Sequence, residues 1–362
     1  MRQPLFFIGG IVQTSIMPIF SPHIGCPHRC VFCNQWQITG HQGLPSPDEV
    51  RRLIASYTAS ARTPRHWEVA FYGGSFTAMP GEVQEGLLQP AYEALEAGTI
   101  AAIRCSTRPD CITPEILQRL QHYGMTCVEL GVQSMDDAVL EQARRGHTAG
   151  DVVAATALLR QYGFTVGHQL MPGLPGEDWP SLVRTTAAIC RLQPDLARIY
   201  PVAVLTGTDL ADSWRAGRYQ PLTIHEGVVR AAYMKQHFLE QGINCIRTGL
   251  QATEDLDDDT QVLAGAYTPA MGELVDTRRY GRQLLSFLRS LPDEPAITIG
   301  YNRRDTSRVR GYRNVTVKTA RWSLPQHLTW HQDEVPLGHI RVCQGRTAYD
   351  LDVNSKTGPT MI

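Results

Sequence analysis

The segment Cys26-Pro27-His28-Arg29-Cys30-Val31-Phe32-Cys33 brings three cysteines together in one short stretch of the chain. Thiolates are the usual protein ligands of iron-sulfur clusters. A cubane cluster has four irons, so three cysteines with no obvious fourth leave one iron open to another ligand. The segment could therefore hold an iron-sulfur cluster that has one iron open to a further ligand.

The same cysteines also fit a zinc site. Zinc accepts thiolate and imidazole ligands in tetrahedral geometry, and His23 or His28 could complete a Cys3His set. The chain would then be a zinc-stabilised nucleic-acid-binding module instead of an enzyme. Cysteine spacing by itself leaves both kinds of site open.

Composition limits the class of protein. The chain has 362 residues, enough for an α/β barrel with an appendage, and its formal net charge of -1 gives no global preference for nucleic acid or membrane. Nine cysteines are too dilute for a secreted disulfide scaffold and fit a reducing cytoplasm. Arg2, Gln3 and Gln13 interrupt the apolar N-terminus, which predicts an opening strand and not a signal peptide. We expect a cytoplasmic protein without a membrane partner.

Short apolar runs alternate with longer helical patterns along the first half of the chain. The predicted strands are Ser15-Phe20, Trp67-Tyr72, Ala101-Ser106, Thr126-Gly131, Thr165-Leu170 and Leu196-Pro201. The predicted helices are Pro47-Ala61, Pro80-Ala97, Pro114-Tyr123, Asp136-Arg144, Asp151-Tyr162 and Trp179-Leu192. Such alternation predicts an α/β fold with a parallel sheet, a partial (β/α)6 TIM-like barrel, carrying a small C-terminal α+β appendage.

Polar and glycine-rich motifs follow these strands, where barrel enzymes carry their chemistry. After the second strand, Gly73, Gly74 and Ser75 allow a close backbone approach and could aim amide and carbonyl groups at a bound amine. After the third strand, Ser106 and Asp110 could bond a ribose, and Arg108 could bind a carboxylate. Asp110 could equally be a helix cap or a turn residue.

The fourth strand carries Glu129, Gly131 and Gln133 at alternating positions, which places them on one face of the sheet. Polar groups inside a barrel need partners, and a bound cofactor can supply them. Glu129 could instead be buried structural polarity. Two further motifs follow, Arg144-Arg145-Gly146-His147-Thr148 and His168-Gln169-Leu170-Met171-Pro172-Gly173-Leu174-Pro175-Gly176.

The C-x-x-x-C-x-x-C spacing, with an aromatic residue before the last cysteine, resembles the signature of the radical S-adenosylmethionine (SAM) superfamily. The resemblance implies that Cys26, Cys30 and Cys33 hold a [4Fe-4S] cluster, that SAM chelates its open iron, and that reductive cleavage gives a 5'-deoxyadenosyl radical. It also implies a set of SAM contacts. Phe32 would lie beside the adenine, together with a wall formed by Gly173, Leu174 and Pro175. Gly73, Gly74 and Ser75 would contact the amino group of SAM, and Arg145 its carboxylate. Gln133 would contact the ribose, and Gln169 would lie near the sugar or methionine part.

A narrower resemblance rests on motifs in a fixed order: STRPD, VELGVQS, RRGHT, MPGLPG and RIYPV, then Gly207-Thr208 and Arg247-Thr248-Gly249-Leu250-Gln251. From about Pro18 to Val275 the chain resembles the radical-SAM domain of the Elongator catalytic subunit and its bacterial relatives. That branch implies modification of a tRNA wobble uridine, with an acetyl group delivered by a C-terminal acetyltransferase domain.

The chain departs from that branch at both ends. Residues 1–25 leave little room for a basic N-terminal extension, and residues 276–362 are too few for a full acetyltransferase domain. We therefore carry over the cofactor chemistry and not the substrate. Two substrate classes therefore remain open. One is RNA, which the Elongator branch suggests, and the other is a small metabolite or tetrapyrrole, as in coproporphyrinogen oxidase. An electron donor such as ferredoxin or flavodoxin is implied.

The C-terminal part is the least informative region of the sequence. We expect a radical-SAM partial barrel over 1–253, an acidic linker and helical connection over 254–295 with a helix near Gly281-Leu291, and a small α+β domain over 296–362. Strands are predicted at Ala296-Gly300, at Asn314-Arg321 and in a hairpin around Gln344-Gly345. The basic segment 301–321 could hold RNA phosphates, with Tyr301 and Tyr312 to stack on bases, or could be an ordinary solvated face.

Overall fold

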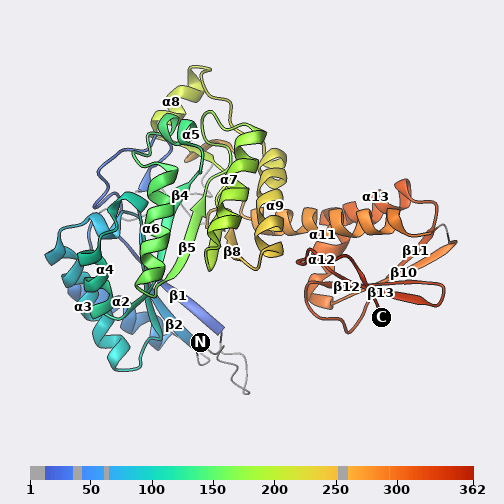
Figure 1. Ribbon diagram of the computed structural model, residues 1–362, viewed down its shortest axis with the longest axis horizontal. Coiled ribbons are helices and arrows are strands. Elements are labelled where there is room, and N and C mark those ends of the chain that lie inside the picture. Colours follow the sequence, from blue (N-terminus) through green and yellow to red (C-terminus); the bar gives the residue numbers. More distant parts are fainter. Residues whose placement is uncertain (1–12, 36–42, 61–64, 252–259, 293) are drawn as a thin grey trace. The chain divides into compact units, whose positions relative to one another are not determined.

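Strands and helices alternate over the first half of the chain as the sequence predicts (Figure 1). The computed structural model describes residues 13–35, 43–60, 65–251, 260–292 and 294–362. The six predicted strands are present as β1 Gln13–Phe20, β2 Arg65–Tyr72, β3 Ala102–Thr107, β4 Met125–Gln133, β5 Thr165–Leu170 and β6 Leu196–Ile199. The helices are α2 Pro47–Ala59, α3 Gly81–Glu96, α4 Pro114–His122, α5 Asp137–Gln142, α6 Ala149–Gln161 and α7 Trp179–Leu192, with 3-10 turns η1 Phe76–Ala78 and η2 Pro109–Cys111.

The strands join a seven-stranded sheet in the order β1-β2-β3-β4-β5-β6-β8. The last member, β8 Asn244–Thr248, follows helix α9 Ile224–Glu240 and adds one strand to the six expected. Strands β1, β2, β3 and β4 pair in parallel, as do β6 and β8. The α/β fold class, a partial TIM-like barrel followed by a C-terminal region with its own sheet, is confirmed.

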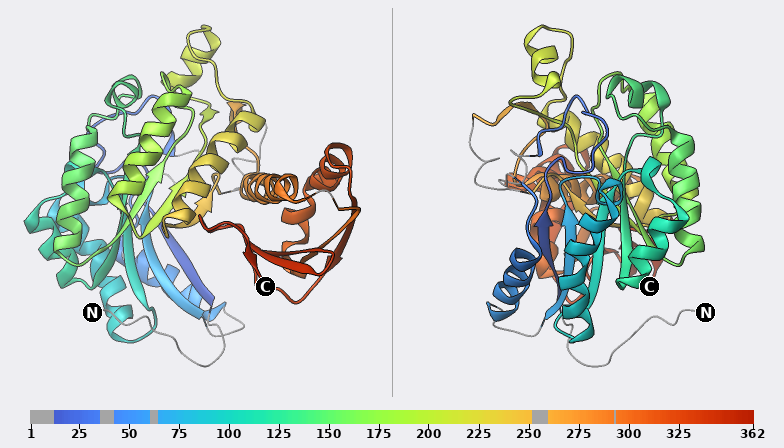
Figure 2. Two further views of the ribbon diagram at one scale, coloured as in Figure 1. Left: turned by 45° about the vertical axis from the view of Figure 1, so that its right-hand side comes forward. Right: turned by 90° about the vertical axis from the view of Figure 1, so that its left-hand side faces the viewer.

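The described residues form two compact units. The first contains the chain up to Arg29 together with Asn34–Val132 and Ala149–Gly167, and the second contains Cys30–Cys33, Gln133–Thr148 and His168–Ile362. In the first unit α2 and α3 pack against each other and against β1 and β3 (Figure 2). The domain boundaries expected from the sequence stay a prediction, and the acidic stretch 254–259 lies outside the described residues.

Side-chain caps explain where several helices begin. Ser46 accepts a hydrogen bond from the Glu49 amide while the Glu49 carboxylate accepts from the Ser46 amide, and Pro47 opens the helix. Thr223 and Glu226 form the same reciprocal pair at the start of α9. Each cap satisfies backbone amides that have no partner within the helix.

The second unit contains three further groups of elements. A two-stranded antiparallel ribbon consists of β7 Ala203–Leu205 and β9 Val262–Gly265, and helix α8 Asp209–Arg215 follows β7. A five-stranded sheet has the order β11-β10-β12-β13-β14, from β10 Ala296–Tyr301, β11 His327–Gln332, β12 His339–Gln344, β13 Thr347–Asp352 and β14 Thr360–Met361. Helices α11 Met271–Ser290, α12 Thr306–Arg310 and α13 Val315–Ser323 accompany it, with turns η3 Arg303–Asp305 and η4 Tyr312–Asn314.

The predicted strand at Asn314-Arg321 is wrong, because α13 occupies this stretch. Its β-branched residues suggested a strand, yet the buried positions Thr316, Val317 and Ala320 follow helical spacing. Strand β10 pairs in parallel with β11, and a parallel pair needs a crossover connection, which α12 and α13 supply. The predicted strand at 296–300 and the hairpin at 344–345 are confirmed.

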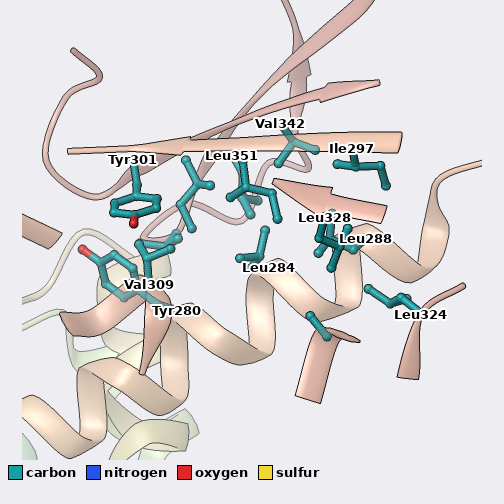
Figure 3. Packing of buried hydrophobic residues seen from close by; sticks show 14 residues of the cluster. Tyr280, Leu284, Leu288, Ile297, Tyr301, Val309, Leu324, Leu328, Val342 and Leu351 are labelled. Atoms are coloured by element: carbon teal, nitrogen blue, oxygen red, sulfur yellow. The ribbon is translucent and has the colours of Figure 1, made fainter. Parts of the chain in front are cut away.

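Helix α11 supplies one side of the C-terminal core. Tyr280, Leu284 and Leu288 on this helix pack beneath apolar residues of β10, β12 and β13 (Figure 3). Tyr301 lies in the same cluster and is buried, so the expectation that it stacks on bases is wrong. The predicted helix near Gly281 exists but begins earlier, at Met271.

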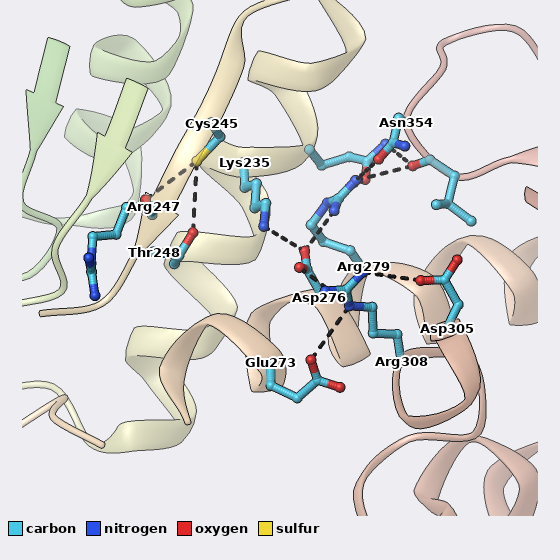
Figure 4. A network of polar contacts seen from close by, with 12 residues as sticks. Lys235, Cys245, Arg247, Thr248, Glu273, Asp276, Arg279, Asp305, Arg308 and Asn354 are labelled. Carbon is cyan, nitrogen blue, oxygen red and sulfur yellow. Dashed lines mark hydrogen bonds and ion pairs between the residues drawn. The ribbon is translucent and has the colours of Figure 1, made fainter. Parts of the chain in front are cut away.

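A polar network links α9, α11 and α12 (Figure 4). Asp276 forms ion pairs with Lys235 at 2.7 Å and with Arg279 at 2.9 Å. Burial alone would raise the pKa of Asp276, but these two cations lower it below its usual value. The charge of Asp276 is therefore balanced internally.

None of the helices in the described ranges is long and apolar enough to span a bilayer.

We predict that Leu284→Ala destabilises the protein by about 2–5 kcal/mol, because it removes a fully buried side chain from the C-terminal core. The free energy of unfolding is measured by urea denaturation. Leu53→Ala, at a position 38% exposed on α2, is the control and is expected to cost far less. Equal losses in the two variants would contradict the assigned core.

Candidate active site

The chain leaving β1 continues beside the chain leaving β2. The Ser21 amide donates to the Tyr72 carbonyl at 2.8 Å, the His23 amide to the Gly73 carbonyl at 3.2 Å, and the Ser75 amide to the Ile24 carbonyl at 3.0 Å. Because β1 and β2 are parallel, with Phe20 opposite Tyr72, both segments leave the sheet at the same edge. The segment that leads to Cys26 is thus fixed to the predicted Gly73-Gly74-Ser75 motif.

Glycine is required at this contact. A Cβ on Gly74 would lie 2.2 Å from the Ile24 carbonyl oxygen, and a Cβ on Gly25 would lie 2.3 Å from the Ser75 carbonyl oxygen. Gly25 and Gly73 also have positive φ angles of 75° and 97°. The backbone of the cysteine segment therefore occupies the space that the missing side chains leave.

Cys26 lies beside the last residue of this motif. Its Sγ is 3.4 Å from the Oγ of Ser75, a residue that is almost fully buried. A serine hydroxyl can donate a hydrogen bond to a thiolate. Ser75 thus contacts a predicted cluster ligand, whereas its predicted contact with the SAM amino group stays a prediction.

His23 joins the two sides of the cysteine motif. Its Nε2 accepts a hydrogen bond from the Gln35 amide at 2.9 Å. Burial lowers the pKa of His23, and Arg29 lowers it further, which favours the neutral ring that this bond requires. Since Nε2 is already engaged, His23 is poorly suited to bind zinc through that atom. Nowhere in the described ranges do three or more His, Cys, Asp or Glu side chains form a group that could hold a metal ion.

Cys30 and Arg145 meet in the second unit. The Arg145 Nη1 donates to the Cys30 Sγ at 3.0 Å, and the guanidinium is buried. A guanidinium donates hydrogen bonds and cannot accept them, so the sulfur is the acceptor in this contact. The contact suits a thiolate ligand of a cluster, and it places the predicted carboxylate-binding arginine directly beside that ligand.

The backbone around Cys30 is held by two helices. The Val31 amide donates to the Ala143 carbonyl at 3.2 Å, just after α5, and the Val31 carbonyl accepts from the Leu210 amide at 2.8 Å, in α8. Thr208 caps α8 by accepting from the Ala211 amide. The Gly207-Thr208 motif therefore orients the helix that holds Val31.

Phe32 and Leu174, both predicted to lie beside the adenine, belong to one apolar cluster. Cys30 and Cys33 are packed against this cluster, which also contains Tyr219. The Tyr219 hydroxyl donates to the Gly173 carbonyl at 2.6 Å, and the Gly173 amide donates to the Glu177 carboxylate at 2.8 Å. Two hydrogen bonds thus fix the backbone of Gly173 in the wall predicted at Gly173 and Leu174.

Arg108 and Asp110 bind each other. Two hydrogen bonds of 2.9 Å join the guanidinium to the carboxylate, and Arg108 is buried. Ser106 lies on β3 opposite Glu129. The proposed contacts of Ser106, Arg108 and Asp110 with SAM stay predictions, and the charge of Arg108 already has an internal partner.

Glu129 takes part in a buried network. Its carboxylate accepts a hydrogen bond from Tyr72 at 2.8 Å and lies 3.8 Å from Arg104, which also pairs with Glu68 at 3.4 Å. A Cβ on Gly167 would come within 2.9 Å of the Glu129 side chain. These contacts favour the structural interpretation of Glu129 over cofactor binding.

Gln133 has features expected of a ligand contact. Its φ angle is 66°, a rare conformation for a residue other than glycine, and its buried Oε1 has no hydrogen-bond partner within the part of the chain that the structure describes. Buried polar atoms are almost always bonded, so an orphaned oxygen indicates a missing partner. Gln169, on β5, is half-buried, and its predicted role is not tested.

Sequence reasoning missed Ser21 as a contributor to the site and considered His23 only as a zinc ligand. Ser21 is buried at the end of β1, and its Oγ has no hydrogen-bond partner among the described residues. Only its place directly after a strand could have drawn attention to it.

The contacts of two of the cysteines suit metal-binding thiolates, although the three cysteine side chains do not form one group in this structure. A serine hydroxyl and a guanidinium contact two of the three thiols, and the orphaned Gln133 oxygen offers an acceptor to a polar ligand. Cys26 and Cys30 are assigned to one cluster by their spacing in the sequence.

We predict that Gly74→Ala reduces the iron bound after anaerobic reconstitution, since its Cβ would displace the segment that leads to Cys26. Gly86→Ala, within α3, is the matched control, because its nearest contact would be an ordinary 3.8 Å and alanine favours a helix. Iron is counted per chain by colorimetric assay. Full iron content in Gly74→Ala would contradict the tight contact.

Comparison with known proteins places this geometry in a family. Residues 20–188 match the Radical SAM superfamily, and residues 194–280 match the Radical_SAM C-terminal domain. The chain is 33% identical over 248 residues to a tRNA uridine(34) acetyltransferase of Dehalococcoides mccartyi, covering 59% of this chain and 53% of that protein. It is 27% identical over 269 residues to human Elongator complex protein 3, covering 60% of this chain and 48% of that protein. It thus spans about half the length of these relatives.

A solved structure agrees at the level of the fold. The archaeal Methanocaldococcus infernus Elp3 with an N-terminal deletion matches with a TM-score of 0.60 and 21% identity, covering 95% of this chain and 76% of that chain. Together the two family matches extend over most of the chain from residue 20 to residue 280. The chain belongs to the radical SAM superfamily and is an enzyme related to the Elongator proteins.

Proposed function

We propose that this protein binds a [4Fe-4S] cluster through Cys26, Cys30 and Cys33, binds SAM beside it, and uses the pair to abstract hydrogen from an RNA substrate. The contact between Arg145 and Cys30 carries the proposal, since it joins a predicted SAM-binding cation to a predicted cluster ligand at 3.0 Å. With both cofactors bound, the cluster would supply the electron for the reductive cleavage of SAM.

The residues of the chain have separate roles in this scheme. The thiolates of Cys26, Cys30 and Cys33 would hold the cluster, and Arg145 would orient the SAM carboxylate by charge-assisted hydrogen bonds. Gln133 offers its unpartnered oxygen to a ribose hydroxyl. Phe32 and Leu174 exclude water from one side of the adenine, because both belong to the apolar cluster around Cys30 and Cys33.

The substrate class rests on the relatives. One of them is named a tRNA uridine(34) acetyltransferase, and the chain covers about half of it, so we carry over RNA as a substrate and leave the acetyl transfer aside. The reaction consumes an electron, which ferredoxin or flavodoxin would supply. All nine cysteines are free thiols, which agrees with work in a reducing cytoplasm.

We predict that the anaerobically reconstituted protein forms 5'-deoxyadenosine when it is reduced with dithionite in the presence of SAM. Cys30→Ala is expected to abolish the product, because the cluster loses a ligand. Cys343→Ala, which removes a thiol on β12 outside the cysteine motif, is the control. The product is quantified by liquid chromatography. A chain that binds stoichiometric zinc and forms no 5'-deoxyadenosine would overturn the proposal.

We predict that Arg145→Ala raises the SAM dissociation constant by about tenfold or more without loss of iron, because a charge-assisted hydrogen bond is removed. Arg144→Ala is the matched control, since Arg144 is exposed and pairs with Asp209. Equilibrium dialysis measures SAM binding. Unchanged affinity in Arg145→Ala would remove Arg145 from the SAM site.

A further inference from the structure

One surface of the C-terminal part combines exposed aromatic rings with cations. It consists of Tyr312, Arg313, Val315, Lys318, Arg321 and Trp322, and we call it the α13 surface. Trp322 is 90% exposed and Tyr312 is 62% exposed. Large aromatic side chains are rarely left this open, because burying them is favourable. Their exposure therefore indicates an interaction.

Helical spacing brings most of these residues to one side. Lys318 follows Val315 by three positions and precedes Arg321 and Trp322 by three and four, and residues at these spacings are neighbours on a helix. The opposite side carries Thr316, Val317 and Ala320, which are buried. Lys318, Arg321 and Trp322 thus occur on the side of α13 that the core does not use.

The charge of this surface is not balanced locally. Asp305 is the single carboxylate within residues 301–323, and it is fully buried, bonded to Arg308 and to the Gly338 amide. Arg308 also approaches Glu273 and Asp276 (Figure 4). Within the described ranges, Arg313, Lys318 and Arg321 have no ion-pair partner, so three exposed positive charges remain available.

The turn before α13 has an uncommon backbone. Arg313 and Asn314 have φ angles of 52° and 59°, two successive left-handed residues of which neither is glycine. The Arg310 side chain donates to the Asn314 side chain at 3.0 Å and so stabilises the turn. In this conformation the Arg313 guanidinium lies 5.2 Å from the centre of the Tyr312 ring. The turn therefore presents a ring and a cation together.

We propose that the α13 surface binds single-stranded RNA, with unpaired bases stacked on Tyr312 and Trp322 and phosphates held by Arg313, Lys318 and Arg321. Stacking on aromatic rings between cations is how proteins bind single strands without a sequence code. This inference rests on the proposed function, which makes RNA the substrate, and it adds the place where that substrate is held outside the cofactor site.

A membrane would require a different arrangement. A helix that lies in a bilayer interface presents a broad apolar face opposite its charges. The apolar side of α13 is buried in the core, and its cations lie beside Trp322 on the exposed side. An acidic protein such as an electron donor would also meet the cations, but it gives no reason for two open rings.

The test measures the anisotropy of a fluorescein-labelled anticodon stem-loop RNA with the full-length reconstituted protein. Trp322→Ala is expected to weaken binding by about 5- to 150-fold, the loss of one stacked base. Trp322→Phe keeps a ring and retains most of the affinity, whereas Trp322→Leu behaves like alanine. Lys318→Ala and Arg321→Ala each reduce the slope of log affinity against log salt by about one.

Controls separate this inference from the proposed function. Arg191→Ala removes an exposed cation on α7 and is expected to change neither affinity nor slope. Formation of 5'-deoxyadenosine without RNA should be equal in all variants, since none touches the cofactor site. A fully paired hairpin should bind more weakly than the stem-loop and should not respond to Trp322→Ala.

The contrary outcomes are also distinct. If the wild type binds the stem-loop and the variants bind it equally well, the proposed role of the α13 surface is wrong, and the proposal that RNA is the substrate stands. If the wild type binds no RNA at about 50 mM salt, both fail, while 5'-deoxyadenosine still reports the cofactor chemistry. If the variants lose binding to flavodoxin and keep binding to RNA, the surface docks a protein and the inference is overturned.

Discussion

The close backbone contact between the segment after β1 and the segment after β2 is the constraint on which the position of Cys26 depends. A carbonyl oxygen of Ile24 lies where Gly74 has no side chain, and a carbonyl oxygen of Ser75 lies where Gly25 has none. Hydrogen bonds from Ser21, His23 and Ser75 then fix the register of the two segments. Since the backbone is in contact on both sides, even one methyl group would force a shift of the cysteine segment.

Much of the barrel was predictable because each strand and helix has a local sequence pattern. Apolar runs ending at Gly, Pro or Ser gave β1 to β6 to within a few residues, whereas β8 was overlooked because it is short and mostly exposed or half-buried. The site was predictable only in part. A Gly-Gly pair indicates that a side chain must be absent, but it does not indicate whether a ligand or the protein backbone fills the space. Likewise, the sequence indicates that Arg108 can bind a carboxylate, but it does not reveal that the partner is Asp110, which is equally compatible with a ribose contact, a helix cap or a turn.

The C-terminal region shows where local patterns fail. Residues 314–321 contain four β-branched side chains, a composition that favours a strand. The pairing of the neighbouring strands determines the structure of this stretch instead, because the parallel strands β10 and β11 need a connection that crosses the sheet. The same crossover leaves one side of α13 without contacts in the core, and so it exposes Trp322 and its neighbouring cations. Parallel pairing between distant strands is not visible in the sequence of either one.

The hydrogen bond between His23 and Gln35 has a thermodynamic consequence. It closes a span of 12 positions around the three cysteines, and it uses protein atoms alone. Fixing the ends of such a loop lowers its conformational entropy during folding and not during metal capture. Three ligands on a restrained loop bind a multinuclear cluster with a smaller entropic penalty than three on a freely moving one, as in any chelate whose donors are held near their final positions. In the proposed cluster site, part of the affinity for iron would therefore depend on a histidine that is not a ligand.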